Sequence, residues 1–409
     1  MNAPRPPLKP LDDALAELLQ CATLLDGVES VSTFEADGRV LAQDLVSALQ
    51  VPPQDNSSMD GYAVRCADVS SAPVVLPVSQ RIAAGSNGAP LAPLSVARIF
   101  TGAPIPPGAD AVVMQEDCEV LADGSVNIKS APELGLWIRR AGEDVTRGAV
   151  VLSKGERLTP AALGLAASIG MATLPVVRRP RVALFSTGDE LVMPGAVAPE
   201  QMKPGAIYNS NRFFLRALLL RLGCEVSDLG IVPDRLDATV AALGQAAQNH
   251  DLILTSGGVS VGEEDHIRPA VQSLGSLDLW QIAIKPGKPF AYGRVQNAHF
   301  IGLPGNPVSS FVTFLLLVRP FLLKLQGVVQ VAINPIAVEA HFTRARADKR
   351  QEFLRARRNA AGGVDLFANQ SSGVLTSAVW GDGLVDIPAG QTIAHGDVVR
   401  FIPFSELLG

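Results

Sequence analysis

The stretch Leu252-Ile-Leu-Thr-Ser-Gly-Gly-Val-Ser-Val-Gly-Glu-Glu-Asp265 joins an apolar run to a glycine-rich turn that carries three carboxylates. The apolar run is typical of a buried strand, and open α/β sheets bind ligands beyond the ends of such strands. Glycines let backbone N–H groups approach an anion, which Glu263, Glu264 and Asp265 would repel unless a cation lay between them. The stretch therefore favours a site for a divalent metal and phosphate. A solvated turn with Asp265 as a helix N-cap explains the same residues equally well.

Strands and helices alternate on both sides of this stretch, from residue 179 to residue 327. We expect strands at 181–186, 225–232, 251–255, 277–285 and 299–303, and helices at 209–223, 236–249 and 306–325. Such alternation predicts a doubly wound α/β domain with a mainly parallel sheet. Short runs punctuated by proline and glycine predict a β-rich module at 51–144 and a C-terminal β-barrel-like domain at 328–409.

Composition narrows the class of protein. The chain has 409 residues, 47% of them hydrophobic and 18% charged, which indicates several globular domains. A net charge of −6 gives no case for nucleic acid as a partner. Four scattered cysteines indicate a reducing cytoplasm. The apolar run 311–318 is shorter than the ~20 residues of a membrane span, so we expect a cytoplasmic protein without a membrane segment.

Polar loops follow three of the expected strands. They are Ser186-Thr-Gly-Asp-Glu190, the turn 256–265, and Lys285-Pro-Gly-Lys-Pro289. Since the carboxyl ends of parallel strands meet at one edge of a sheet, these loops predict a ligand crevice in which Lys285 and Lys288 bind phosphate. For each residue taken alone, a solvated surface charge is the competing interpretation.

A second kind of chemistry has a weaker signal. Gly258-Val-Ser-Val-Gly262 fits the nucleophile elbow of serine hydrolases, with Ser260 as nucleophile and His299 or His395 as base. Three acids crowd the turn and no HGGG-type oxyanion segment is present, so this hypothesis is disfavoured. The sequence also lacks the glycine-rich motifs of P-loop and Rossmann proteins.

Eight ordered segments give the chain a family resemblance. They are Asn56–Ala63, Phe100–Pro104 with Gly108–Glu116, Gly142–Asp144, Ser186–Leu191, Asn209–Asn211, Ser256–Gly262, Ile284–Pro289 and Gly302–Val308. Together they resemble the molybdopterin molybdenumtransferase family, which includes MoeA and the gephyrin E domain. The resemblance implies an enzyme that inserts molybdenum from molybdate into adenylylated molybdopterin and releases AMP, with Mg²⁺ as cofactor.

The resemblance also implies an assembly. Residues 1–50 and 145–178 would form one discontinuous domain, interrupted by the β module at 51–144, and the α/β domain at 179–327 and the C-terminal domain at 328–409 would complete four. The molecule would be a homodimer whose active site is shared between the α/β domain of one subunit and the β module of the other. Molybdopterin adenylyltransferase and recipient molybdoenzymes would be its protein partners.

Roles for single residues follow from the resemblance and from the anionic substrates. The catalytic candidates are Asp60, Thr101, Asp144, Glu190, Asp234 and Asp265, of which Glu190, Asp234 and Asp265 would hold the metal. An N-cap role is an equally good interpretation of Asp234. The substrate-binding candidates are Arg140, Ser186, Thr187, Gly188, Ser256, Gly257, Gly258, Lys285, Lys288, Pro304, Pro307, Arg350, Ser371 and Ser372, the last three for molybdate.

Two other functions compete with this one. A scaffold role like the clustering function of gephyrin would keep the fold but would need no carboxylate cluster. Adenylyl transfer to molybdopterin uses the same kind of α/β domain, but the length of the chain argues against it.

Overall fold

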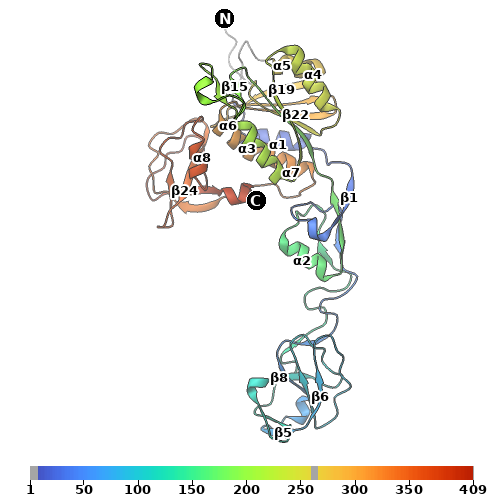
Figure 1. Cartoon of the computed structure of the whole chain (residues 1–409). Helices are drawn as coiled ribbons and strands as arrows, with labels where there is room; N and C mark the ends of the chain where they lie inside the picture. The colour runs from blue at the N-terminus through green and yellow to red at the C-terminus, as the bar shows by residue number, and fades with distance from the viewer. Residues whose placement is uncertain (1–7, 259–265, 409) are drawn as a thin grey trace.

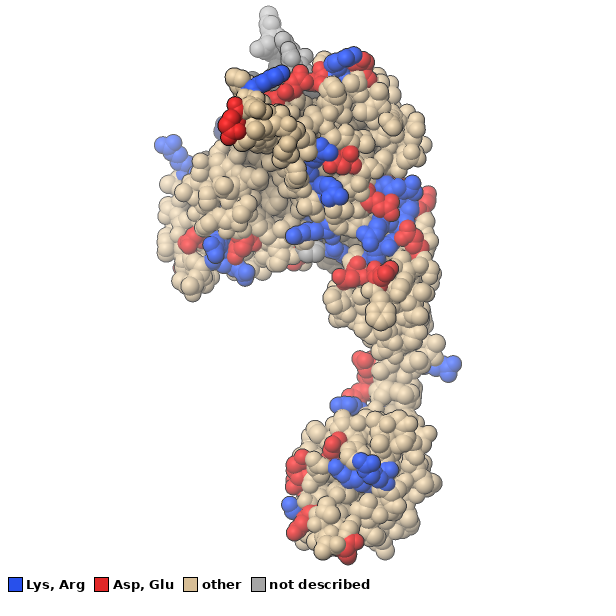
Figure 2. Space-filling model, viewed as in Figure 1, with Lys and Arg blue, Asp and Glu red and all other residues tan. Residues whose placement is uncertain are grey.

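The computed structural model describes residues 8–258 and 266–408. Figure 1 shows an elongated, hooked molecule, in which the α/β domain and the C-terminal β domain lie side by side at one end. A smaller unit that contains helix α2 (Pro160–Ser168) follows, and the β module that contains β5, β6 and β8 forms the far end. Figure 2 shows acidic and basic side chains interspersed over this face of the molecule.

A six-stranded sheet organises the α/β domain in the order β17-β14-β18-β22-β21-β19. The first four strands are mutually parallel, and β21 alone runs antiparallel to its neighbours β22 and β19, so the doubly wound α/β prediction with a mainly parallel sheet is confirmed. Their bounds are β14 Arg181–Thr187, β17 Glu225–Val232, β18 Leu252–Ser256, β19 Gly275–Gln281, β21 Pro289–Val295 and β22 Ala298–Leu303.

The strand expected at 277–285 is wrong in its second half. β19 ends at Gln281, and β20 (Ile284–Lys285) pairs instead with β24 (Gln351–Arg358) in the sheet of the C-terminal domain. The Lys285 loop therefore does not follow a parallel strand of the α/β sheet.

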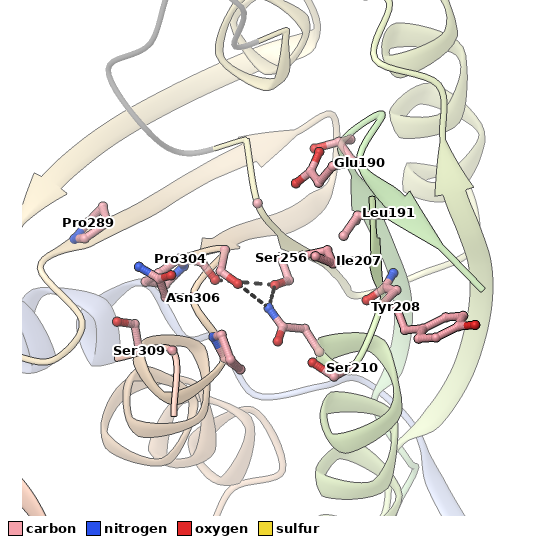
Figure 3. Close-up of a pocket in the computed structure, with 17 residues that line it drawn as sticks. Glu190, Leu191, Ile207, Tyr208, Ser210, Ser256, Pro289, Pro304, Asn306 and Ser309 are labelled. Atoms are coloured by element: carbon pink, nitrogen blue, oxygen red, sulfur yellow. Dashed lines mark hydrogen bonds between the residues drawn. The ribbon is translucent and has the colours of Figure 1, made fainter. Parts of the chain in front are cut away.

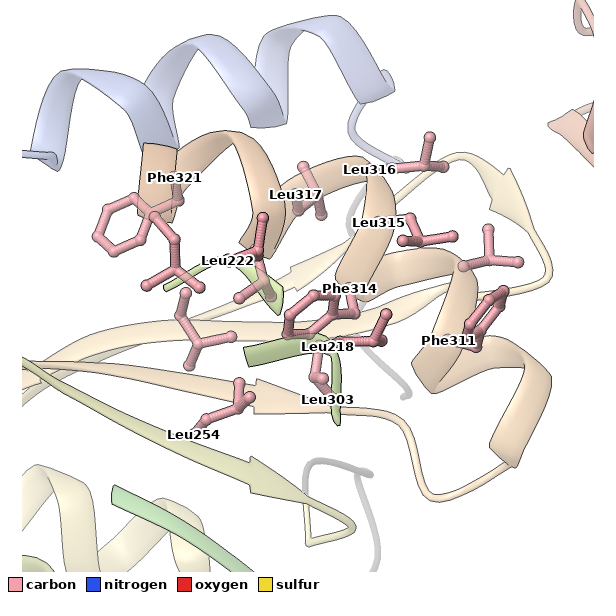
Figure 4. Packing of buried hydrophobic residues seen from close by; sticks show 14 of the residues in the cluster. Leu218, Leu222, Leu254, Leu303, Phe311, Phe314, Leu315, Leu316, Leu317 and Phe321 are labelled. Atoms are coloured by element: carbon pink, nitrogen blue, oxygen red, sulfur yellow. The ribbon is translucent and has the colours of Figure 1, made fainter. Parts of the chain in front are cut away.

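Helices cover both faces of this sheet. One face carries α3 (Asn211–Arg221) and the run α6 (Pro307–Thr313), η5 (Phe314–Val318) and α7 (Arg319–Leu325), which pack into the largest hydrophobic core. Figure 4 shows Leu218, Phe314 and Leu303 of that core together. The other face carries α4 (Leu236–Ala247) and α5 (Ile267–Leu274).

The helical run Pro307–Leu325 is apolar and long enough to span a membrane by composition, but 94% of its most apolar window is buried inside the protein. It is therefore a core helix. Its middle turn, η5, is a π-helix just before Pro320. Proline lacks the N–H that a regular helix would use four residues back, and such a site is a common cause of helix irregularity.

Helix α1 packs against the α/β domain, whereas the resemblance groups residues 1–50 with residues 145–178. α1 (Leu11–Cys21) buries Leu11, Ala14 and Leu18 in the core of the α/β domain, where it packs against η5 and α7. The apolar stripe of α1 thus belongs with that domain, and the structure does not group the helix with residues 145–178.

The unit next to the α/β domain is built from segments on both sides of the β module. Antiparallel β1 (Val28–Ser32) and β13 (Thr173–Val177) form one ladder, and β2 (Leu45–Val46) pairs with β12 (Val150–Leu152). Helix α2 packs its buried Ala162 and Ala166 against this unit. Thr159 caps the helix by accepting a hydrogen bond from the Ala162 N–H at 3.2 Å.

The two remaining units are β-rich. The β module holds a four-stranded sheet, β6-β7-β4-β8, and a three-stranded sheet, β5-β10-β9. Their bounds are β4 Gly61–Val64, β5 Val74–Leu76, β6 Val78–Ile82, β7 Val96–Ile99, β8 Ala111–Met114, β9 Cys118–Val120 and β10 Val126–Ile128. The C-terminal domain continues from β24 through β26 (Gly383–Ile387) and β27 (Val398–Pro403) to β23 (Ile336–Glu339), with the short helices α8 (Thr376–Trp380) and α9 (Phe404–Leu408).

An ion pair fastens the α/β domain to its neighbour. Arg178 donates two hydrogen bonds of 2.7 Å to the Asp251 carboxylate and a third to the Asp26 carbonyl. Burial raises the pKa of Asp251, but hydrogen bonds from Arg178 and from the Arg181 N–H lower it below its usual value. Both side chains are at most one-fifth exposed, so little solvent screens the pair.

Asp251→Asn should therefore lower the free energy of unfolding at neutral pH by about 1–3 kcal/mol, because it leaves Arg178 without its counter-charge. Since the folded pKa is depressed, the native pair stabilises above the ordinary pKa of 3.8 and loses this effect as the pH falls below it. Urea unfolding between pH 7 and pH 3 should show a shallower pH dependence in the variant. Asp382→Asn, which removes a more exposed pair with Arg358, is the control and should cost less than about 1 kcal/mol.

Candidate active site

A cavity of about 640 Å³ opens at the carboxyl ends of the parallel strands. Its lining comes from the ends of β14 and β18, the loop after β22, the starts of α3 and α6, and one residue of the C-terminal domain. The lining residues are Thr187, Glu190, Leu191, Ile207, Tyr208, Asn209, Ser210, Asn211, Ser256, Gly257, Pro289, Pro304, Gly305, Asn306, Pro307, Ser309 and Gly373. In Figure 3, Glu190 and Tyr208 lie on one side of Ser256, and Asn306 and Ser309 lie on the other.

Backbone conformation brings the loops close together. The Gly257 N–H donates to the Leu303 carbonyl at 3.1 Å, and Gly257 has a φ of +95°. A Cβ on Gly257 would lie 3.0 Å from the Thr187 carbonyl oxygen. Only glycine adopts this conformation without strain at such a close approach. The glycine in the motif is thus needed for the packing of three adjacent strand ends.

Asn211 holds two of these loops in register. Its Nδ2 donates to Ser256 Oγ at 2.7 Å and to the Gly305 carbonyl at 2.7 Å, and the side chain is buried. These bonds, dashed in Figure 3, span the floor of the cavity. Asn211 therefore fixes the spacing between the β18 loop and the β22 loop.

Asn211→Asp should lower the free energy of unfolding by about 1–3 kcal/mol, because an ionised carboxylate has no proton to donate and would face the Gly305 carbonyl. Urea unfolding measures this loss. Asn249→Asp, at an exposed position just after α4, is the matched control. Equal loss in both variants would contradict the proposed positioning role.

The cavity lies at two helix N-termini. Asn209, Ser210 and Asn211 start α3, and Asn306 and Pro307 start α6, which continues as a helix to Leu325. The first N–H groups of a helix lack partners within the helix, and its dipole favours negative charge there. Two such ends facing one cavity make it suited to an anionic ligand such as a pyrophosphate group.

Two buried polar atoms beside the cavity lack a partner among the described residues. They are Ser186 Oγ at the end of β14 and Asn209 Nδ2, and both side chains are at most 2% exposed. A buried polar group without a hydrogen bond is unfavourable, so unsatisfied groups next to a cavity indicate a ligand or water contact. Asn209 Oδ1 accepts a hydrogen bond from the Arg212 N–H at 3.3 Å, so only its amide nitrogen is left over.

Glu190 is the one acidic residue in the described lining of the cavity. Its carboxylate lies back over Gly188, where a Cβ would sit 2.5 Å from Oε2. Gly188 has a φ of +136°, so glycine at this position serves both the turn and the placement of Glu190. Within residues 8–258 and 266–408 the Glu190 carboxylate has no hydrogen-bond or ion-pair partner, so a ligand in the cavity can contact it.

Several predicted residues meet at this cavity. Thr187, Glu190, Ser256, Gly257, Pro304 and Pro307 line it. Ser186 and Gly188 are the chain neighbours of the lining residue Thr187. Gly258 also lies close to the lining, since a Cβ at this position would be 2.9 Å from Thr187 Oγ1. The Ser372 carbonyl accepts a hydrogen bond from the Val308 N–H at 2.9 Å, so the loop of Ser371 and Ser372 touches the start of α6.

The predicted cations lie outside the lining. Lys285 Nζ contacts Glu352 at 2.9 Å and Asp348 at 3.1 Å, and Arg350 pairs with Asp348 at 3.0 Å. Lys288 is half-buried and does not line the cavity. Only Pro289 of this loop reaches it. The Lys285 loop meets the other two through Pro289, whereas the Lys285 side chain is directed to Glu352 because β20 pairs with the C-terminal sheet.

The β module carries the other predicted residues. Asp60 Oδ1 accepts hydrogen bonds of 2.8 Å from the Thr101 N–H and from Thr101 Oγ1, and these bonds lower its pKa. Arg140 pairs with Asp55 at 2.7 Å, and Asp144 is exposed. Within one chain the β module, which carries Asp60 and Thr101, lies at the far end from the α/β domain (Figure 1).

Two of the three predicted metal ligands, Glu190 and Asp234, lie within the described residues. Asp265 and the alternative nucleophile Ser260 lie outside the described residues. Asp234 precedes α4, whose N-cap is Arg235 rather than Asp234, and it does not line the cavity. Among the described residues no three His, Cys, Asp or Glu side chains gather into a metal site.

Sequence reasoning missed much of the lining. Asn209, Ser210, Asn211, Asn306 and Ser309 had no assigned role, although they start helices that follow strands. The available signal was a pair of Asn-rich helix starts, Asn209-Ser-Asn211 and Gly305-Asn-Pro307, in a domain whose strand ends carry polar loops.

A cavity at the carboxyl edge of a doubly wound sheet, between two helix N-termini, defines an α/β protein that binds an anionic ligand. Residues 183–324 match the family described as a probable molybdopterin binding domain. Residues 9–170 match the MoeA N-terminal region (domain I and II), and residues 337–404 match the MoeA C-terminal region (domain IV).

Similar proteins cover the chain almost completely. The molybdopterin molybdenumtransferase of Haemophilus influenzae is 40% identical over 406 residues, 98% of this chain and 99% of that protein. The protein of the same name from Synechococcus elongatus is 38% identical over 91% of this chain and 94% of its own. A crystal structure of the molybdopterin biosynthesis MoeA protein from Pyrococcus horikoshii superposes with a TM-score of 0.84 at 28% identity, over 97% of this chain and 100% of that one. The chain belongs to the molybdopterin molybdenumtransferase family of transferases, the MoeA family.

Proposed function

We propose that this chain transfers molybdenum from molybdate to adenylylated molybdopterin and releases AMP. The observation that carries the proposal is the cavity of about 640 Å³, which lies within the segment that matches a molybdopterin-binding domain. The names of the relatives support the same reaction for this chain.

The geometry of the cavity suits the pyrophosphate linkage of the substrate. The N-termini of α3 and α6 face the same space, which Gly257 of the β18 loop also lines. Ser186 and Asn209 offer buried polar atoms without partners among the described residues. These groups are held in place before the ligand arrives, which lowers the cost of orienting two anions for reaction.

Magnesium is part of this proposal on chemical grounds. A carboxylate at Glu190 and a pyrophosphate in one cavity would repel each other, and a divalent cation between them would remove that repulsion. The described residues contribute Glu190 alone at the cavity, so they do not complete a magnesium site by themselves. We therefore assign Glu190 the role of orienting the pyrophosphate end of the substrate and derive no step through the metal.

Molybdate would approach from the C-terminal domain. Gly373 lines the cavity, and Ser372 is hydrogen-bonded to the start of α6. Arg350 is paired with Asp348 at 3.0 Å. Its positive charge is thus partly neutralised, and binding of a dianion would require it to exchange Asp348 for the oxyanion.

The far position of Asp60 and Thr101 supports a site shared in a homodimer. Thr101 is exposed and Asp60 is partly exposed, and Asp60 is held as a carboxylate by its bonds to Thr101. In a symmetric dimer the β module of one subunit would contribute them to the α/β domain of the other. We further propose a cytoplasmic location, with molybdopterin adenylyltransferase as the supplier and molybdoenzymes as recipients of the product.

The direct test supplies purified protein with adenylylated molybdopterin, magnesium and molybdate, and follows AMP release and molybdenum insertion together. The proposed transferase should release AMP and load molybdenum in equal amounts, and both should cease when magnesium is chelated. Adenylylation of molybdopterin from ATP by this protein would instead establish the preceding reaction and refute the proposal.

A further inference from the structure

Trp137 has a backbone conformation that is unusual for a bulky residue. Its φ is +57°, in the left-handed region that favours glycine and, among other residues, asparagine. The residue lies directly before β11 (Ile138–Arg139), which pairs with β3 (Asn56–Ser57). Its carbonyl accepts hydrogen bonds from the Ser58 N–H at 2.9 Å and from Ser58 Oγ at 3.0 Å, and these bonds hold the strained backbone in place. Backbone strain of this kind is concentrated at active sites and ligand clamps.

The position of Trp137 adjoins two predicted catalytic residues of the β module. The Ser57 carbonyl accepts a hydrogen bond from the Gly102 N–H at 2.8 Å. The chain at Thr101 therefore runs along one edge of β3, and Trp137 adjoins the other edge. Asp60 follows β3 in the chain and is hydrogen-bonded to Thr101. Trp137 thus belongs to the same small region of the β module as Asp60 and Thr101.

The indole ring of Trp137 lacks a ring partner. Of the three tryptophans in the chain, Trp280 stacks on Phe290 at 5.7 Å and Trp380 contacts Phe367 at 5.4 Å. Within residues 8–258 and 266–408 no aromatic or cationic side chain stacks on Trp137, and the residue is 36% exposed. An exposed indole on a fixed backbone is suited to stack on a planar ligand.

The cavity that we assign to the substrate offers no such surface. Tyr208 is the only aromatic residue in its described lining. The Tyr208 hydroxyl donates to the Val197 carbonyl at 2.8 Å, and in Figure 3 the ring points away from Ser256. Adenylylated molybdopterin carries two fused rings, a pterin and an adenine, and proteins commonly hold such rings by stacking them on aromatic side chains. An aromatic surface from the β module of a second subunit would complete the site.

We propose that Trp137 is a substrate-binding residue of the shared site, in which its indole ring stacks on a fused heterocycle of the substrate, the pterin or the adenine. The inference rests on the proposed function, because it needs the β module of one subunit to meet the α/β cavity of the other. It adds a contact for the flat part of the substrate, whereas Glu190 orients its charged pyrophosphate end.

Isothermal titration calorimetry of the purified full-length protein tests this contact with three separate probes, which are AMP, 6-hydroxymethylpterin and inorganic pyrophosphate. Trp137→Asn should weaken the binding of AMP or of the pterin roughly tenfold, because it removes the stacking surface. Trp137→Phe keeps an aromatic ring and should bind the same probe within about threefold of the native affinity. Pyrophosphate has no ring, so both variants should bind it as the native protein does.

Asparagine at this position separates a binding role from a structural one. It adopts the left-handed backbone more readily than tryptophan, so the melting temperature of Trp137→Asn should stay within about 1 °C of the native value while its affinity falls. Leu94→Asn is the matched control, because Leu94 has a φ of +56°, is also exposed and lies in the same module. The Leu94 N–H bonds to Asp68, away from β3, so this variant should bind all three probes normally.

The probe that loses affinity identifies the ring, since a loss for AMP assigns the adenine and a loss for 6-hydroxymethylpterin assigns the pterin. Native affinity of Trp137→Asn for both ring compounds would overturn the role of Trp137 and leave the proposed function intact. Equal weakening of pyrophosphate and of the ring compounds would indicate a damaged fold and would also refute stacking. If the native protein binds none of the three probes, the proposed function fails, and this inference fails with it.

Discussion

Glu190→Gln is expected to lower the rate of AMP release by roughly a hundredfold, the scale seen when one preorganised polar group is lost from an active site. The change keeps the size of the side chain and removes its charge from a cavity in which it is the one acidic residue of the described lining. Glu190 is exposed, so the melting temperature should stay within about 1 °C of the native value. AMP release over a magnesium titration measures the effect.

The neighbouring Asp189 provides the control. It is also exposed but does not line the cavity, so Asp189→Asn should retain nearly native AMP release. If both variants release AMP at the native rate at every magnesium concentration, Glu190 has no role in orienting the pyrophosphate. If both lose activity equally, the loss reflects the turn at Gly188 rather than the charge at position 190.

The α/β domain could be predicted from local pattern because each parallel strand is an apolar run followed by a polar loop. The run at 181–186 corresponds to β14, and the run at 251–255 to β18, each within one residue at either end. The failure at 277–285 has a long-range cause. Ile284 and Lys285 pair with Gln351 and Glu352, more than sixty residues later, and no local pattern contains that partner.

The limits of site prediction have a similar origin. Thr187 and Ser256 end β14 and β18, and Glu190 lies in the loop that follows β14, so their positions in the chain were enough to indicate that they meet. Lys285 was misplaced because its side chain follows β20 toward Glu352 and the C-terminal sheet. Asn211 was missed because its role depends on hydrogen bonds to Ser256 Oγ and to the Gly305 carbonyl. Both acceptors are far from Asn211 in the sequence, so residue spacing does not reveal these contacts.

The placement of α1 shows the same distinction for packing. Helical spacing puts Leu11, Ala14 and Leu18 on one face of α1, but it does not determine which surface covers that face. The structure supplies the answer, since α7 and η5 present an apolar surface that α1 covers.

Mixing an Asp60→Asn variant with a Glu190→Gln variant is expected to restore AMP release that neither variant has alone. Asp60 lies in the β module at the far end of the chain from the cavity that holds Glu190 (Figure 1). In a dimer with shared sites, each hybrid would contain one site that lacks both carboxylates and one site that keeps both. With random exchange half of the dimers are hybrids, so activity should approach about a quarter of the native value.

The control for this experiment is a mixture of Asp60→Asn with Thr101→Val, whose altered residues are hydrogen-bonded to each other within the same module. Both changes damage the same half of a shared site, so no hybrid would contain an intact one and activity should not return. Subunit exchange is verified by native mass spectrometry of differently tagged chains. If exchange is complete and the Asp60→Asn and Glu190→Gln mixture stays at the activity of its parents, each site lies within one subunit, because only a shared site can be rebuilt from two damaged chains.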